Sequence, residues 1–149
     1  MTSFGTWLAA EASSPARGAP VGFGPLAARV TAPSGRFNGL GVAVLPAIGY
    51  DNSSSFRALH VLAGELARQG CLVARVDPYA TGDSAGIAGE VADLRAWKNA
   101  VEEGSAYLRR SGARQVVLVG CRFGATLAIL GAEAVGAAAV VALAPVVSG

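Results

Sequence analysis

The chain has 149 residues, of which 52% are hydrophobic and 15% charged, and its formal net charge is +2. Charged residues make up about 25% of an average soluble domain, so this composition excludes a disordered chain and a coiled coil. The basic residues are scattered, with Arg109 and Arg110 as the only adjacent pair, and they form no basic stripe for nucleic acid. We therefore expect a single domain with a core of its own and no nucleic-acid partner.

The mean hydropathy of +0.46 requires that a membrane protein be considered. The first residues carry no basic region and no continuous apolar segment, so they do not form a secretory signal. The strongest candidate for a membrane span is residues 123–147, but glycines and Pro145 interrupt it and its alanines are weakly apolar. We predict a cytoplasmic protein without a membrane span, and we interpret these residues as a buried helix followed by a buried strand.

Taken in chain order, the sequence alternates between strands and helices. Residues 1–22 are rich in alanine, serine, proline and glycine and are expected to be a loose lead-in to a domain at residues 23–149. Residues 46–55 are expected to be a loop in which Asn52 and the following serines are possible helix N-caps. Residues 78–89 form a glycine-rich loop. The remaining segments are a short strand within 24–33, strands at 40–45, 72–76, 115–120 and 137–144, and helices from 56 to the stop at Gly70, at 90–110 and at 123–134.

This alternation is typical of βαβ units around a parallel sheet. The strands are continuous apolar runs, as expected where helices cover both faces of the sheet. We therefore predict the α/β class, with a mostly parallel sheet flanked by helices.

Functional sites of such sheets lie at the carboxyl ends of the strands. No G-x-G-x-x-G and no P-loop sequence follows any strand, so no nucleotide cofactor is expected. The single histidine, His60, lies among apolar residues of a helix and is interpreted as a packed side chain, so no histidine-rich metal site is predicted. Cys71 and Cys121 lack C-x-x-C spacing. Their spacing leaves a disulfide between them as an alternative, but we expect two buried, reduced thiols.

Two segments that follow predicted strands are compared with the nucleophile elbow because both have the spacing G-x-x-x-G. Gly120-Cys121-Arg122-Phe123-Gly124 directly joins a strand to a helix, which is the setting of the nucleophile elbow G-x-S-x-G. Arginine occupies the place of the serine, and a guanidinium is not a nucleophile. Cys121 is one position away, and its side chain is expected to point elsewhere.

The second segment, residues 82–86 (GDSAG), contains a serine, Ser84. It lies about six residues after its strand, whereas an elbow places the nucleophile within one or two residues of the strand end. We interpret it as a turn in which Asp83 and Ser84 cap the next helix, with a nucleophilic Ser84 as the alternative. His60 precedes both segments, so a triad in the chain order serine, acid, histidine is not available.

Several segments, read together, resemble the α/β-hydrolase superfamily. They are similar to the serine aminopeptidase-like (S33-type) hydrolases, and within these to the group known as exosortase A system-associated hydrolases, some of which also have arginine at the elbow centre. The resemblance covers roughly residues 23–149. The segments that carry it are residues 46–50 (PAIGY), 54–59 (SSFRAL), 77–86 (DPYATGDSAG), 119–126 (VGCRFGAT) and 144–149 (APVVSG).

The resemblance implies an elbow at residues 120–124 and an oxyanion hole made by the amide of Phe123 together with that of Ala47 or Ile48. It also implies that the catalytic acid and histidine follow the strand at 137–144, so we expect an incomplete α/β-hydrolase-like domain, truncated after its sixth strand. The departures are the missing elbow serine and the absence of a segment that supplies the acid and histidine. Arg122 then either binds an anion, such as a ligand carboxylate or phosphate or the carboxylate of Asp77, or simply points to solvent or to a structural partner.

Three functions remain open at this point. The first is an inactive relative of serine ester and amide hydrolases, which in one form uses Arg122 to bind a small anionic ligand. The second is an active hydrolase completed by a further segment or a partner chain. The third is an interaction domain whose strand at 137–144 is an exposed edge that a second copy or another partner covers.

Overall fold

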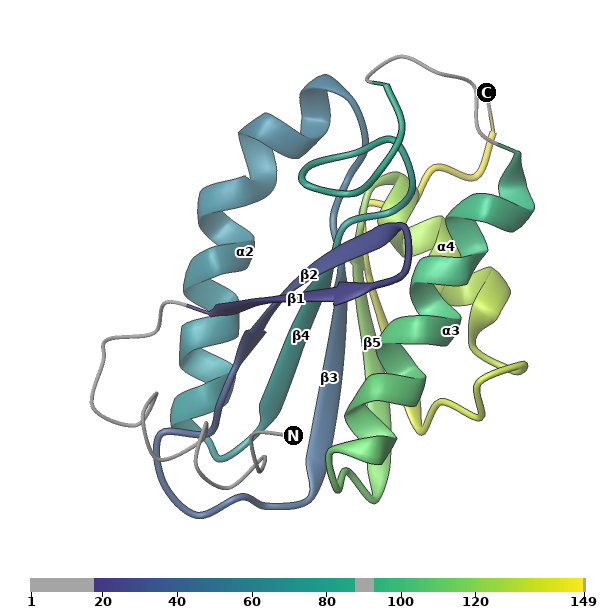
Figure 1. Ribbon diagram of the computed structural model, residues 1–149. Coiled ribbons are helices and arrows are strands. Elements are labelled where there is room, and N and C mark those ends of the chain that lie inside the picture. The colour runs from purple at the N-terminus through teal and green to yellow at the C-terminus, as the bar shows by residue number, and fades with distance from the viewer. Residues whose placement is uncertain (1–17, 88–92, 149) are drawn as a thin grey trace.

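The structure is a computed structural model, and it describes residues 18–87 and 93–148. In this part of the chain six strands form one sheet in the order β1-β2-β4-β3-β5-β6 (Figure 1). Strand β2 pairs antiparallel with β1 and β4, whereas β3 pairs parallel with β4 and β5, and β5 parallel with β6. The predicted α/β class with a mostly parallel sheet is confirmed. The strands are β1 (Ala19–Phe23), β2 (Leu26–Thr31), β3 (Leu40–Leu45), β4 (Leu72–Val76), β5 (Gln115–Cys121) and β6 (Ala139–Leu143).

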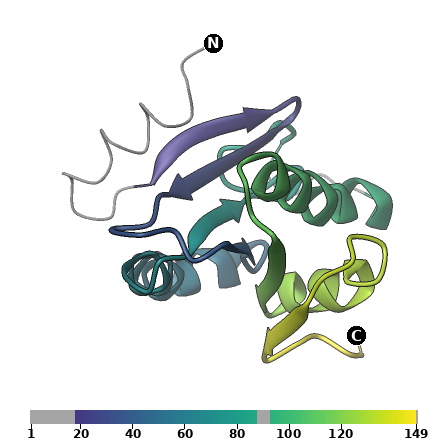
Figure 2. The same ribbon diagram turned by 90° about the horizontal axis from the view of Figure 1, so that it is seen from below.

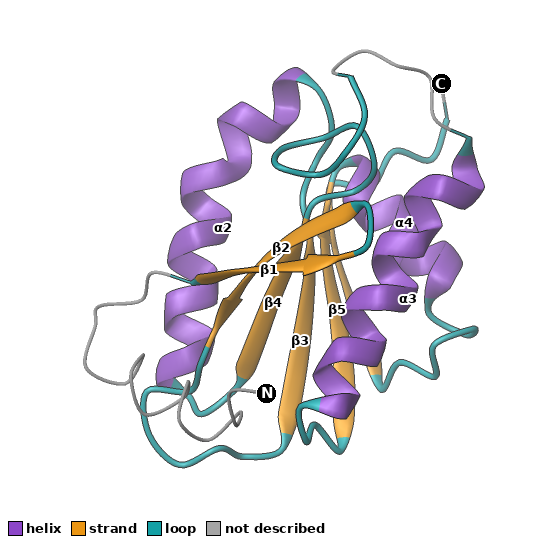
Figure 3. Cartoon of the chain, in the orientation of Figure 1, coloured by secondary structure: helices purple, strands orange, loops and turns teal. Residues whose placement is uncertain are grey.

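Helices cover both faces of this sheet. Helix α2 (Tyr50–Arg68) lies on one face, and α3 (Leu94–Arg110) and α4 (Phe123–Gly131) lie on the other (Figures 2 and 3). Successive side chains of a strand point to opposite faces, and β3 shows this directly. Val42 and Val44 pack in the cluster under α2, whereas Ala43 and Leu45 pack in the cluster under α3 and α4. Two apolar layers explain why the central strands are continuous apolar runs.

The sheet begins earlier than the sequence predicts. Strand β1 starts at Ala19, inside the expected lead-in, and forms a hairpin with β2 through a turn in which Gly24 has a φ of 60°. Pro20 is tolerated there because β1 is an edge strand, where a missing amide removes no ladder bond that the sheet needs.

Helix α2 also begins earlier than predicted. It starts at Tyr50, within the expected loop, and its N-cap is Gly49, with a φ of 67° and no side-chain capping bond. The hydroxyls of Ser54 and Ser55 donate to the carbonyls of Tyr50 and Asp51, at 3.5 and 2.8 Å. The predicted capping role of Asn52 and the serines is therefore wrong, because they lie inside the helix after its N-cap, and Ser54 and Ser55 bond back to carbonyls of the first turn.

The later elements differ from the predictions mainly at their ends. Helix α3 is capped by Asp93, whose carboxylate accepts a bond from the amide of Ala96 at 2.7 Å. The predicted start of this helix at residue 90 lies outside the described residues. Helix α4 ends at Gly131 and is followed by β6, as expected for residues 123–147, but β6 is an exposed edge and not a buried strand. Its Val141 and Leu143 side chains are 45% and 43% exposed.

No helix within the described ranges is both long and apolar enough to cross a membrane. Both cysteines are free thiols; Cys71 is buried and Cys121 is half-buried.

Candidate functional site

The turn between β5 and α4 has the backbone of a sharp elbow. Arg122 is the N-cap of α4 and has a φ of 55° and a ψ of −118°. A positive φ is uncommon for a residue with a side chain and indicates local strain. The amide of Arg122 donates to the carbonyl of Leu143 in β6 at 2.9 Å, and its carbonyl accepts from the amide of Ala125 at 3.1 Å. Neighbouring strands and the new helix thus hold the turn in place.

The two glycines of this turn lie where backbone meets backbone. A Cβ atom at Gly120 would lie 2.4 Å from the Cα of Ala125, and one at Gly124 would lie 2.2 Å from the carbonyl oxygen of Leu45. Real Cβ atoms do not approach that closely, so only glycine lets α4 begin so near to β5 and β3. The G-x-x-x-G spacing predicted for an elbow therefore has a steric cause here.

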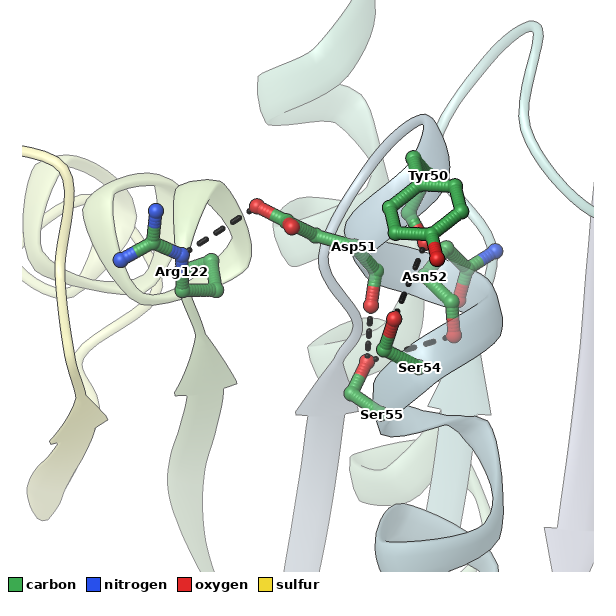
Figure 4. A network of polar contacts seen from close by, with 6 residues as sticks. All are labelled: Tyr50, Asp51, Asn52, Ser54, Ser55 and Arg122. Atoms are coloured by element: carbon green, nitrogen blue, oxygen red, sulfur yellow. Dashed lines mark hydrogen bonds and ion pairs between the residues drawn. The ribbon is translucent and has the colours of Figure 1, made fainter.

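The Arg122 side chain reaches across to the first turn of α2. Its Nε lies 3.2 Å from Oδ2 of Asp51, and each of these side chains is 50% exposed (Figure 4). The carboxylate expected as a possible partner, Asp77, is not the one that Arg122 contacts. The sequence does not indicate Asp51 as the partner, because 71 residues separate it from Arg122 and its segment is predicted to be a loop. The ion pair links the elbow to the segment that follows β3.

That segment contains the residues proposed for an oxyanion hole. Gly120 is the register partner of Leu45, so the carboxyl ends of β5 and β3 are adjacent. Ala47 is buried and Ile48 half-buried just beyond Leu45. On the other side, Phe123 opens α4, where a helix leaves its first amides without intrahelical acceptors. The structure thus brings all three predicted positions to one edge of the sheet.

Ser84 occupies a different and largely enclosed position. It is 8% exposed, its hydroxyl donates to the carbonyl of Asp77 at 2.6 Å, and the same oxygen accepts from the amide of Ala27 at 2.8 Å. The hydroxyl therefore ties the loop after β4 to β2, and it does not cap α3. Asp83 does not cap α3 either, because the N-cap is Asp93. The Asp83 carboxylate pairs with Arg29 at 3.4 Å, while its amide donates to the Asp77 carboxylate at 3.0 Å.

The carboxyl of Asp77, at the start of this loop, has a shifted pKa. Burial raises the pKa of the Asp77 carboxyl, against the opposing effect of the hydrogen bond from the Asp83 amide. Among the described residues no group of three or more histidine, cysteine, aspartate and glutamate side chains could hold a metal ion.

Comparison with solved structures shows which fold this arrangement belongs to. The chain is similar to an α/β serine hydrolase without a lid from Xanthomonas campestris, with 20% identity and a TM-score of 0.69 over 85% of this chain and 61% of that one. It is also similar to an α/β serine hydrolase homologue from Coxiella burnetii, with 18% identity and a TM-score of 0.63 over 80% of this chain and 58% of that one. Est1E from Butyrivibrio proteoclasticus matches with 18% identity and a TM-score of 0.64 over 87% of this chain and 51% of its own length.

These similarities show that the chain has the fold of the α/β serine hydrolases. It spans between 51% and 61% of the length of these three structures. No protein-family model matches the sequence, and no curated protein matches it either.

Proposed function

We propose that this chain is a non-hydrolytic relative of the serine ester and amide hydrolases, and that its elbow binds an anion. The observation that carries the proposal is Arg122, which stands at the elbow centre where a hydrolase of this fold presents its serine. A guanidinium keeps its proton at any physiological pH, so it cannot attack a carbonyl and form an acyl intermediate. It can, however, bind a carboxylate with two parallel hydrogen bonds.

The position of the Arg122 side chain supports binding. Only its Nε contacts Asp51, and the two terminal nitrogens are directed away from that carboxylate (Figure 4). The side chain is half exposed, so a ligand can reach it. The first-turn amides of α4, beginning with Phe123, add partial positive charge at the same place. A small ligand with a carboxylate, including the acid part of an ester or amide compound, suits this arrangement.

The motifs at residues 77–86 and 119–126 favour a more specific relationship. Within our proposal the chain is related to the serine aminopeptidase (S33) type of hydrolase and to the exosortase A system-associated group. Arginine at the elbow centre in some members of that group supports the same relationship.

A fluorophosphonate probe tests the absence of hydrolytic chemistry. We expect no covalent labelling of the purified protein, because Arg122 offers no hydroxyl and the Ser84 hydroxyl is held by two backbone groups. Intact-protein mass spectrometry reads the result, and Ser84→Ala is the matched variant. Labelling of the wild-type protein that Ser84→Ala abolishes would overturn the proposal and favour an active hydrolase.

Titration with acetate tests the binding part. We expect acetate to shift the amide resonances of Phe123 and Gly124, and Arg122→Ala to weaken this binding by roughly two- to fivefold, because exposed charge pairs contribute about 0.2–1 kcal/mol. Arg36→Ala removes another exposed guanidinium and should change nothing. Equal acetate affinity in the wild-type and Arg122→Ala proteins would contradict an anion site at the elbow.

A further inference from the structure

A pocket of about 240 Å³ lies on the face of the sheet that α2 covers. Its wall includes Val44 of β3, Asn52, Phe56 and Leu59 of α2, and Arg75 of β4, with Asp77 just beyond the end of β4. Neither Arg122 nor the elbow glycines line it. The pocket is therefore separate from the site in the proposed function, although both lie near the first turns of α2.

Arg75 is the unusual residue of this pocket. It is 8% exposed, and its Nε is buried without a hydrogen-bond partner in the described part of the chain. Its guanidinium lies over the ring of Phe56, with 5.3 Å between the guanidinium carbon and the ring centroid. The ring binds one flat side of the guanidinium, but a ring does not replace a hydrogen-bond acceptor. Burial lowers the pKa of Arg75, as expected for a charge removed from water.

The neighbouring strand increases the positive charge at Arg75. Arg29 of β2 is the register partner of Arg75, so the two side chains project from the same face of the sheet. Arg29 forms an ion pair with Asp83 at 3.4 Å between largely exposed groups, which neutralises it only weakly. Asp77 is the other nearby carboxylate, and one of its oxygens accepts from the Asp83 amide. Among the described residues Arg75 itself has no ion pair within 4.0 Å.

We propose that this pocket binds a small monocarboxylate, whose carboxylate accepts hydrogen bonds from Arg75 and whose apolar part lies against Phe56 and Leu59. The ligand gives the guanidinium a charged acceptor, which no described residue supplies as an ion pair, and a planar carboxylate matches the planar donor edge of arginine. The volume is slightly below the range of about 300–1,000 Å³ for drug-sized ligands, so a short chain fits better than a large molecule. Asp77 and Asp83 also line the pocket and repel a dianion more strongly than a monoanion, which disfavours phosphate.

Butanoate is the probe that tests this site in the purified protein. We expect a titration followed by NMR to shift the backbone amides of Asn52, Phe56 and Arg75, and we expect butan-1-ol and inorganic phosphate to bind at least tenfold more weakly. Arg75→Met keeps the apolar stem of the side chain and removes the guanidinium. It should weaken butanoate binding about tenfold or more, a factor that corresponds to about 1.4 kcal/mol.

Arg57→Met is the matched control, because Arg57 is an exposed arginine of α2, next to Phe56, and it does not line the pocket. It should leave the affinity unchanged. Phe56→Ala is a second variant, chosen because Phe56 is 55% exposed and tolerates truncation better than a core residue. It should reduce the affinity for butanoate more than that for acetate. The change in the ratio of these two affinities tests the proposal if Arg75→Met does not fold.

Two results would overturn the proposal. The first is unchanged butanoate affinity in Arg75→Met, or an unchanged ratio of butanoate to acetate affinity in Phe56→Ala. The second is butanoate binding that shifts Phe123 and Gly124 instead and that Arg122→Ala removes, which would place the carboxylate at the elbow. A failure of the elbow site alone would leave the shifts at Asn52, Phe56 and Arg75 intact, so the two proposals fail separately.

Discussion

Residues 82–86 and 120–124 share the spacing G-x-x-x-G, but the two segments are built for different reasons. At 120–124 the glycines lie where a second backbone passes, and the turn follows its strand directly. At 82–86 the glycines provide positive φ angles of 52° and 108° in a loop well beyond the end of β4, and Ser84 fastens that loop to β2. The pattern of letters is the same in both, and the distance from the strand end determines which segment becomes an elbow.

Gly124→Ala is the change with the largest expected effect. The new Cβ would lie 2.2 Å from the carbonyl oxygen of Leu45, so α4 must move away from β3. We expect the free energy of unfolding to fall by about 3 kcal/mol, at the upper end of overpacking effects. Urea denaturation measures the change. Gly86→Ala should cost less, because its Cβ would lie 2.8 Å from the Cβ of Ala80 in a loop, and its cost comes mainly from the φ of 108° that alanine must adopt.

Gly35→Ala is the control for both glycine variants, because a Cβ there meets nothing within 4 Å and the φ is not positive. It should leave the midpoint of denaturation nearly unchanged. If Gly124→Ala were as harmless as Gly35→Ala, the steric account of the elbow would be wrong.

Ser84→Ala should have the next largest effect. It leaves the amide of Ala27 without its acceptor and the carbonyl of Asp77 without its donor. We expect a loss of about 1–3 kcal/mol in the free energy of unfolding. Ser53→Ala, on the exposed side of α2, should be neutral or slightly stabilising. Equal losses of unfolding free energy in the two variants would show that the two hydrogen bonds of the Ser84 hydroxyl do not stabilise the fold.

Asp77→Asn changes how stability depends on pH. Burial raises the folded-state pKa of Asp77, so its contribution to stability is fully present below the pKa of the unfolded chain and is lost as pH rises through the folded-state pKa. The variant should therefore be no less stable than wild type at neutral pH, and it should lose stability less steeply between acidic and neutral pH. Denaturation midpoints measured across this range give the two slopes, and identical slopes would contradict the assignment to Asp77.

Asp51→Asn should have the smallest effect. The ion pair with Arg122 is half exposed, so we expect a loss of less than about 1 kcal/mol. The difference from wild type should shrink as salt is raised from about 0.1 M to about 1 M, since added salt shortens the screening length. Glu102→Gln alters an exposed acid without an ion pair in the described structure and serves as the control. A larger loss would mean that the elbow depends on this pair.

The central part of the fold is well determined by local sequence. Strands β3 and β4 occupy the residues that their apolar runs predict, because strands buried on both faces need no alternation. The elbow was also predictable, since its glycines directly follow such a run. Helix α2 began earlier than expected because its first turns are polar and exposed, with Tyr50 at 87%, so no apolar period indicates them.

The pairings that make up the sites were not predictable in the same way. Asp51 meets Arg122, and Arg75 meets Phe56, only because β3, β4 and β5 are adjacent in the sheet and α2 packs on one face of it, against β4. These contacts depend on sheet order and helix placement, which a single sequence does not encode locally. The lone arginine in the otherwise apolar strand at residues 72–76 is a sequence signal of a buried charge that needs a partner.

The crowding at Gly120 and Gly124 has an evolutionary consequence. The close backbone contacts of the turn fall on the two glycines, while the central side chain, Arg122, is half exposed. Replacement of residue 122 therefore changes the chemistry of the turn, whereas the close backbone contacts at Gly120 and Gly124 stay the same. A single substitution at position 122 can thus exchange a cation for a hydroxyl, or the reverse, without adding an atom to the two crowded glycine positions.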